Sequence, residues 1–215
     1  GEPGIDAISF TGSEATGRTV VGAAAQRGAR AQAEMGGVNG LIVLADADLD
    51  AAADGAINGA FFAAGQRCTA TSRIIVERAA AAALIERIEA RMAALRIGDP
   101  RDRQTQIGPL VSPRQKAAVT AAAAQMRADG RQALDGGRGD TAPACFVNPL
   151  LFTDMSPDDL VMREEVFGPV AGLMVVDDYE AALQALNAVR FGLCAGLYTT
   201  SLARADHFKR NARVG

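Results

Sequence analysis

Short apolar runs alternate along the chain with longer segments in which apolar residues recur every three or four positions. Short runs rich in β-branched residues are typical of buried strands, and the longer period is that of amphipathic helices. The predicted strands are Ile5–Phe10, Leu41–Leu44, Ser72–Glu77, Phe146–Phe152, Val170–Val176 and Ala195–Thr199. The predicted helices lie at about 13–26, 46–65, 79–95, 113–129, 179–189 and 202–211. This alternation predicts an α/β fold with a largely parallel sheet.

Composition and charge narrow the class of protein. The chain has 215 residues, 49% of them hydrophobic and 22% charged, which is enough for one large domain, or for one domain plus a piece of another. The formal net charge is −3, with Lys and Arg spread along the chain. This balance argues against nucleic acid or an anionic membrane as a partner. No apolar stretch reaches the length of a membrane span.

The three cysteines, Cys68, Cys145 and Cys194, are widely spaced. An odd count without clustering argues against a disulfide framework and against a zinc site. We therefore expect a reducing, cytoplasmic compartment and no bound metal. The single histidine, His207, would have to serve any Cys–His dyad, but it lies in a polar helical stretch, where a solvated surface position is expected.

Cys68 is the first candidate for chemistry. A buried cysteine is usually a small hydrophobic residue, and Cys145 and Cys194 fit that interpretation. Cys68 instead follows a predicted helix in the segment Gly65-Gln66-Arg67-Cys68-Thr69, where polar neighbours and a glycine favour an exposed position. The adjacent Arg67 would also favour the thiolate, so Cys68 is predicted to be a nucleophile.

Glu34 is the candidate general base. A lone glutamate is normally a solvated surface charge, but two glycines follow this one immediately. They allow a backbone or a ligand to approach closely. A covalent acyl-enzyme route needs such a base near its thiol, although sequence spacing alone does not bring Glu34 to Cys68.

Two further segments carry weaker signals. The turn at Gly12-Ser13, which leads toward Gly17, either caps a helix or holds a phosphate at the helix N-terminus. The segment from Glu164 to Pro169 places two acids beside an aromatic residue. No histidine or third acid has metal-ligand spacing there, and Glu165 could equally accept hydrogen bonds from a ribose diol.

Seven segments carry a resemblance to a known family. They are Phe10-Thr11-Gly12-Ser13 with Gly17, Glu34-Met35-Gly36-Gly37 with Asn39, Gly65-Gln66-Arg67-Cys68, Gly98-Asp99-Pro100, Ile107-Gly108-Pro109-Leu110-Val111, Glu164 to Pro169, and Asn187 with Gly192-Leu193. In this order and spacing they resemble the aldehyde dehydrogenase superfamily over essentially all 215 residues. Each motif is weak alone, but seven in register are specific.

The resemblance implies a mechanism. Cys68 would attack the aldehyde carbon to give a thiohemiacetal, hydride would pass to NAD or NADP, and Glu34 would activate the water that hydrolyses the thioester. The backbone N–H of Cys68 would form half of the oxyanion hole. The chain has residues that are less common in the family at four positions, Met35, Val38, Gly40 and Phe191. These differences leave the implied roles of Cys68 and Glu34 in place.

The resemblance also implies cofactor contacts and a domain organisation. Gly12 and Ser13 match the turn over the cofactor pyrophosphate, Glu165 the position that holds the nicotinamide ribose, and Phe167 the position that packs against the nicotinamide. Residues 1–37 would be the last strand-helix piece of a Rossmann-like cofactor domain. Residues 38–215 would be the catalytic domain, without the oligomerisation segment.

The same resemblance predicts that the chain is a fragment that is inactive alone. Earlier strands of the cofactor domain would precede Gly1, and a closing strand and oligomerisation segment would follow Gly215. The parent protein is expected to be a homo-oligomer that acts on a small-molecule aldehyde.

Substrate and rival functions stay open. The segment around Cys68 looks most like that of semialdehyde dehydrogenases, with Arg67 pairing a distal carboxylate of the substrate, although a structural role for Arg67 is a serious alternative. A CoA-acylating relative is the nearest rival, but that branch commonly lacks a glutamate at the position of Glu34. A non-catalytic truncated chain is the other alternative.

Overall fold

The computed structural model describes residues 4–137, 139 and 145–215. The chain divides into two compact units, Gly1–Gly37 and Val38–Gly215. Their roles as cofactor and catalytic domains remain predictions.

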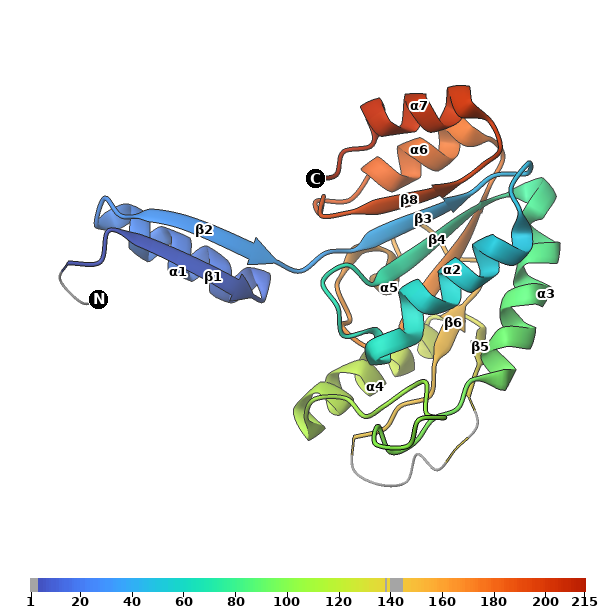
Figure 1. The fold of residues 1–215 in the computed structure, drawn as a ribbon, viewed down its shortest axis with the longest axis horizontal. Coiled ribbons are helices and arrows are strands. Elements are labelled where there is room, and N and C mark those ends of the chain that lie inside the picture. The colour runs from blue at the N-terminus through green and yellow to red at the C-terminus, as the bar shows by residue number, and fades with distance from the viewer. Residues whose placement is uncertain (1–3, 138, 140–144) are drawn as a thin grey trace. The chain divides into compact units, whose positions relative to one another are not determined.

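The first unit is a strand-helix-strand motif. Its strands β1 (Ala7–Gly12) and β2 (Arg30–Met35) pair in parallel, and helix α1 (Glu14–Gln26) connects them (Figure 1). Ser13 caps α1, as its sequence position predicts, by accepting a hydrogen bond from the N–H of Thr16 at 3.4 Å. The chain leaves the helix through Gly28, whose φ of 71° favours glycine.

Strand β2 corrects the prediction that this unit ends as a strand-helix piece. Its sequence, Arg-Ala-Gln-Ala-Glu-Met, lacks β-branched residues and is exposed at most positions. The pattern of a buried strand is therefore absent, and pairing with β1 supplies the strand instead. Gly17 allows α1 to approach this strand, since a Cβ there would lie 2.6 Å from Sδ of Met35.

The second unit is built on a six-stranded sheet with the order β5-β6-β7-β4-β3-β8. All neighbours pair in parallel except β5 and β6. The strands are β3 (Asn39–Val43), β4 (Thr71–Glu77), β5 (Ala133–Asp135), β6 (Leu150–Phe152), β7 (Val170–Val176) and β8 (Ala195–Tyr198). The parallel sheet is confirmed. Strand β5 was not predicted, and the strand predicted at Phe146–Phe152 begins only at Leu150.

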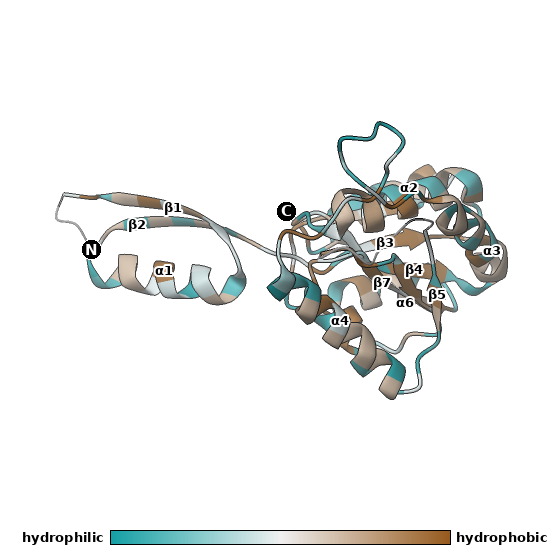
Figure 2. Cartoon of the chain, turned by 90° about the horizontal axis from the view of Figure 1, so that it is seen from below, coloured by the Kyte–Doolittle hydropathy of each residue, from teal (hydrophilic) through white to brown (hydrophobic). Residues whose placement is uncertain are grey.

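Helices cover both faces of this sheet. α2 and α3 lie on one face and α6 on the other, as the two views in Figures 1 and 2 agree. The helical segments are α2 (Leu49–Phe61), the 3₁₀ turn η1 (Phe62–Gly65), α3 (Arg78–Ala94), α4 (Pro113–Ala128), α5 (Leu160–Arg163), α6 (Tyr179–Asn187) and α7 (Leu202–Asn211). The helix predicted to run to residue 65 thus ends earlier, at Phe61, where the chain tightens into η1. None of the helices in the described ranges is long and apolar enough to cross a membrane.

The core lies between the sheet and its helices. Ile42, Ile74, Ile75 and Leu173 from the central strands are fully buried. Figure 2 shows these strands as hydrophobic ribbons between two layers of helix. Burial on both faces is typical of parallel strands, which is why their sequences form continuous apolar runs.

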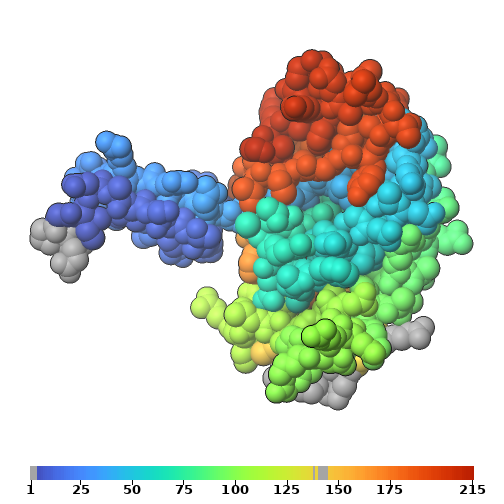
Figure 3. All heavy atoms as spheres, viewed as in Figure 1, coloured from blue at the N-terminus to red at the C-terminus, as the bar shows by residue number. Residues whose placement is uncertain are grey.

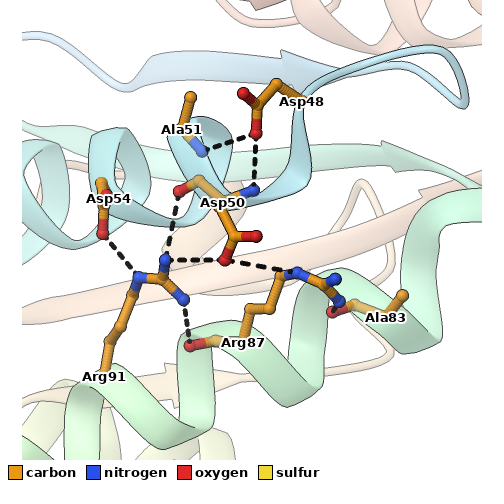
Figure 4. Close-up of polar contacts among 7 residues, drawn as sticks. All are labelled: Asp48, Asp50, Ala51, Asp54, Ala83, Arg87 and Arg91. Atoms are coloured by element: carbon orange, nitrogen blue, oxygen red, sulfur yellow. Dashed lines mark hydrogen bonds and ion pairs between the residues drawn. The ribbon is translucent and has the colours of Figure 1, made fainter.

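A network of charged side chains joins α2 to α3 on the surface (Figure 4). Arg91 of α3 donates from Nε to Asp54 at 2.5 Å and from Nη2 to Asp50 at 2.9 Å. Arg87 lies 3.5 Å from the same carboxylate of Asp50. This network holds the helix whose C-terminal end leads to Cys68.

The network predicts a salt- and pH-dependent contribution to stability. The hydrogen bond from Arg91 is the largest cause that lowers the pKa of Asp50 below 3.8. A carboxyl with a lowered folded pKa stabilises the fold above its unfolded pKa, and this contribution is lost as pH falls through the folded value. Arg91→Gln should therefore lower the melting temperature by a few degrees at pH 7 and low salt, as measured by circular dichroism.

The difference from wild type should shrink in about 1 M salt, where charges are screened, and below about pH 4, where aspartates become protonated. Arg101→Gln is the control, because Arg101 pairs with Asp99 two residues away, a local contact that joins no two helices, and its side chain is 89% exposed. An unchanged melting temperature for Arg91→Gln at low salt would exclude a stabilising role for the network.

Candidate active site

Segments far apart in the sequence meet at the amino ends of four neighbouring strands. Parallel strands start at the same edge of a sheet, and β7, β4, β3 and β8 are adjacent in that order. The residues at these strand starts are Gly168-Pro169 before β7, Cys68–Ala70 before β4, Asn39 in β3, and Cys194 before β8. The fold therefore brings together motifs that the sequence separates by up to 155 positions.

The loop that presents Cys68 begins with an unusual turn. Ala63, Ala64 and Gly65 have φ values of 56°, 52° and 66°, which lie in the left-handed region. A Cβ on Gly65 would lie 2.1 Å from the backbone oxygen of Gly168, so only glycine allows this approach. The segment before Cys68 therefore packs directly on the Glu164–Pro169 segment.

Side chains in this loop bind neighbouring backbone groups. Gln66 accepts a hydrogen bond from the N–H of Val111 at 2.9 Å. Arg67 donates to the carbonyls of Asn58 and Gly59 at 2.5 and 3.1 Å. These carbonyls belong to the last turn of α2, where a cation is favoured by the helix dipole. The geometry agrees with the structural alternative for Arg67, and its predicted contact with substrate remains a prediction.

Cys68 is exposed, whereas Cys145 and Cys194 are partly buried. The predicted exposure of Cys68 is thus confirmed, while its role as nucleophile remains a prediction. Burial, followed by the nearby Cys68, raises the pKa of the Cys194 thiol. Cys194 is therefore less available as a thiolate at neutral pH. Figure 3 shows turquoise atoms of the segment between α2 and β4 on the visible face of this unit.

Asn39 is the site residue whose role sequence reasoning missed. Its side chain is nearly buried, with 5% exposure of the residue, and it donates to the carbonyls of Cys68 and Ala70 at 2.8 and 2.9 Å. Its own oxygen accepts the N–H of Cys194 at 3.2 Å. Asn39 belongs to one of the motifs that carry the family resemblance, but no sequence signal shows that its amide reaches the Cys68 loop.

The Glu164–Pro169 segment forms a second wall of this edge. Phe167 has a φ of 52° and is 38% exposed as a residue. Gln115 donates to the backbone oxygens of Val166 and Phe167 at 3.0 and 2.9 Å and so holds this turn. Glu165 is half-buried. No group of three or more His, Cys, Asp or Glu among the described residues could hold a metal ion.

The remaining predicted residues lie in the first unit. Gly12 and Ser13 form the exposed turn from β1 into α1, and Glu34 is exposed on β2. Glu34 and Cys68 thus belong to different units, and their approach remains a prediction.

His207 lies on the surface helix α7. It is exposed, as predicted, and its Nδ1 atom is 2.8 Å from the hydroxyl of Tyr179. This contact ties α7 to α6 and needs no chemical role.

Cys68 should be the most reactive thiol of the folded chain. Iodoacetamide at neutral pH should alkylate it several-fold faster than Cys145 or Cys194, because it is exposed and the other two are partly buried. Peptide mapping over a time course gives the three rates, and the unfolded chain, in which exposure is equal, is the control. Faster labelling of either of the other cysteines would overturn the assignment.

Comparison with known proteins supplies the family. The model of the aldehyde dehydrogenase family matches residues 1–215. A betaine aldehyde dehydrogenase from Cereibacter sphaeroides is 39% identical over 208 residues, which are 97% of this chain and 43% of that protein. The chain therefore spans less than half the length of this curated relative.

Solved structures agree. An NAD-dependent aldehyde dehydrogenase from Sinorhizobium meliloti superposes with a TM-score of 0.96 at 34% identity, covering 100% of this chain and 43% of that one. A 1-pyrroline-5-carboxylate dehydrogenase from Thermus with bound NAD gives 0.92 at 33% identity, with 100% and 42% covered. The chain belongs to the aldehyde dehydrogenase family.

Proposed function

We propose that the protein containing this chain oxidises an aldehyde to a carboxylic acid with NAD⁺ or NADP⁺, through covalent intermediates on Cys68. Family membership supports the reaction, and the observation that carries it is the exposed Cys68 on a loop anchored at four strand starts. Relatives that are NAD-dependent or hold NAD favour NAD⁺.

The residues of this chain can perform the covalent steps. The thiolate of Cys68 would form a C–S bond to the aldehyde carbon, while the aldehyde oxygen takes up the negative charge. The backbone N–H of Cys68 would donate a hydrogen bond to that oxygen. When bound, NAD(P)⁺ supplies the acceptor that oxidises this adduct, which leaves a thioester on Cys68. Glu34 would then take a proton from water while the water oxygen attacks the thioester. This step would release the carboxylic acid and the thiolate of Cys68.

We propose that residues of each unit contact the dinucleotide. The strand-helix-strand unit directs the N-terminus of α1 toward the end of β1, and Gly17 lets helix and strand pack closely. Gly12 and Ser13 would hold the pyrophosphate at this helix N-terminus. In the second unit, Glu165 would accept hydrogen bonds from the nicotinamide ribose, and the partly exposed ring of Phe167 would pack against the nicotinamide.

The remaining proposals concern the length of the active protein, its location and its oligomeric state. Since the chain covers 42–43% of the solved relatives, we propose that activity needs the remaining length of an aldehyde dehydrogenase and that the 215-residue chain alone is inactive. All three cysteines are free thiols, which supports a cytoplasmic location. We also propose that the full-length protein is a homo-oligomer.

The substrate is proposed to be a semialdehyde with a distal carboxylate, bound by Arg67. A second candidate is betaine aldehyde, which relatives at 39% identity carry in their names and which needs no carboxylate partner. The bonds from Arg67 to the end of α2 favour this second candidate.

Kinetics of Arg67→Gln in the full-length protein separate these substrates. If Arg67 pairs with a carboxylate, KM for a carboxylate-bearing aldehyde should rise about tenfold or more while KM for a neutral aldehyde stays unchanged, since a charge-assisted bond is lost. Equal losses for both aldehydes would show that Arg67 only supports the loop. Wild type tested with betaine aldehyde provides the comparison.

Glu34 should act in deacylation more than in acylation. In the full-length protein, Glu34→Gln should keep a burst of NAD(P)H formation but slow steady turnover by about 100-fold or more, because general-base catalysis is lost. Rapid-mixing absorbance at 340 nm measures both phases, with Asp6→Asn as control, because Asp6 is an exposed acid before β1 on the same unit.

Two results would contradict this assignment. An unchanged steady-state kcat in Glu34→Gln would remove Glu34 from the mechanism, and turnover by wild type only with added CoA would favour the CoA-acylating alternative. A wild-type protein without aldehyde-dependent NAD(P)H formation and without thermal stabilisation by NAD(P)⁺ would favour the non-catalytic one.

A further inference from the structure

Asn39 joins three strand starts through a single side chain. It lies at the start of β3, between β4 and β8, and the register of β3 on β4 shifts between Asn39 and Gly40, as at a β-bulge. Bulges redirect side chains and are common beside active sites. Here the amide contacts Cys68 and Ala70 on one side and Cys194 on the other.

We propose that Asn39 is a positioning residue for the nucleophile, which together with the turn from Arg67 to Ala70 sets the direction of the Cys68 side chain and of its backbone N–H without touching the substrate. The inference rests on the proposed function, in which Cys68 is the nucleophile. It adds a role for Asn39, which the proposed function does not include.

The two peptide groups that flank the Cα atom of Cys68 are both held. The carbonyl of Arg67 accepts the N–H of Ala70 at 2.9 Å, which fixes the plane containing the N–H of Cys68. The carbonyl of Cys68 accepts Nδ2 of Asn39 at 2.8 Å, which fixes the plane on the other side. With both planes fixed, the Cα–Cβ bond and the N–H of Cys68 have one direction each, before any substrate binds.

An asparagine amide is well suited to this task. Its Nδ2 group donates to two backbone carbonyls, and its Oδ1 atom accepts a hydrogen bond from a backbone N–H. Every polar atom of the side chain therefore has a hydrogen-bond partner at a nearly buried position. An aspartate has the same shape, but when ionised it has no donor and faces two carbonyl oxygens. When protonated it regains one donor while its other oxygen still accepts the N–H of Cys194. Burial raises the pKa of a carboxyl group, which brings this change into the range of an assay.

Steady-state kinetics of Asn39→Asp and Asn39→Ala in the full-length protein test the proposal. Both variants should lose about 10- to 100-fold in kcat, the scale expected for a small misplacement of reacting groups, with KM for the aldehyde changed by less than about threefold. The kcat of Asn39→Asp relative to wild type should rise as pH falls, because the protonated carboxyl restores one hydrogen bond. The relative kcat of Asn39→Ala should not depend on pH.

Asn187→Asp is the matched control. The amide of Asn187 also joins two backbone groups, with Nδ2 on the oxygen of Asn211 and Oδ1 on the N–H of Arg213, at 3.0 and 2.8 Å. It contacts none of the Cys68 loop in these bonds. Its relative kcat should stay near wild type at every pH. All assays are run well below the melting temperature of each variant, with the folded fraction checked by circular dichroism.

The outcomes separate this proposal from the proposed function. A wild-type protein that does not oxidise aldehydes with NAD(P)⁺ defeats the proposed function. If the wild type is active, a near-normal kcat in folded Asn39→Ala overturns the positioning role alone. The role is also overturned if the relative kcat of Asn39→Asp shows the same pH dependence as that of Asn39→Ala. If one variant does not fold, kcat of the other decides.

Discussion

The site depends on the parallel pairing of β7, β4, β3 and β8, because this pairing alone brings their starts to one edge. The central strands are buried on both faces, so a slip of register would move their side chains to the opposite faces, disrupt the packing of the core and leave carbonyls of the Cys68 loop without partners. Hydrophobic burial therefore sets the register, and the register places Asn39 opposite the loop. The position of the Cys68 loop is thus determined by the buried strands.

Two turns at this edge of the sheet have strained backbone, one before Cys68 and one in the Glu164–Pro169 segment. Ala63, Ala64 and Phe167 occupy the left-handed region, at a cost of about 1–3 kcal/mol each for residues other than glycine. Close packing of Gly65 on Gly168 and the hydrogen bonds of Gln115 hold these turns. Such cost is retained where the surroundings over-determine the conformation, and the proposed role of Cys68 as a nucleophile held before substrate binding would require it.

The sequence predicts most elements of the sheet and few of its polar details. Val170–Val176 and Leu202–Asn211 match their predictions because a continuous apolar run and a capped periodic segment are local signals. Strand β2 and the three-residue β5 were not predicted, since tertiary pairing and not local preference forms them. Cys68 was predicted as an exposed loop residue from its neighbours. The bonds of Asn39 were not, because a polar residue at a strand start is normally exposed.

Arg73, near the start of β4, also makes contacts that its sequence position does not predict. An arginine in a strand is expected to face water, yet Arg73 is only 3% exposed. Burial lowers the pKa of its guanidinium to about 10, so it remains a cation at neutral pH. It donates to the backbone oxygens of Val38, Ala185 and Leu186 at 3.1, 3.0 and 3.0 Å. The last two belong to the C-terminal turn of α6, whose dipole favours a cation. The first lies immediately before Asn39, so this buried charge holds the backbone from which the Asn39 amide reaches the Cys68 loop.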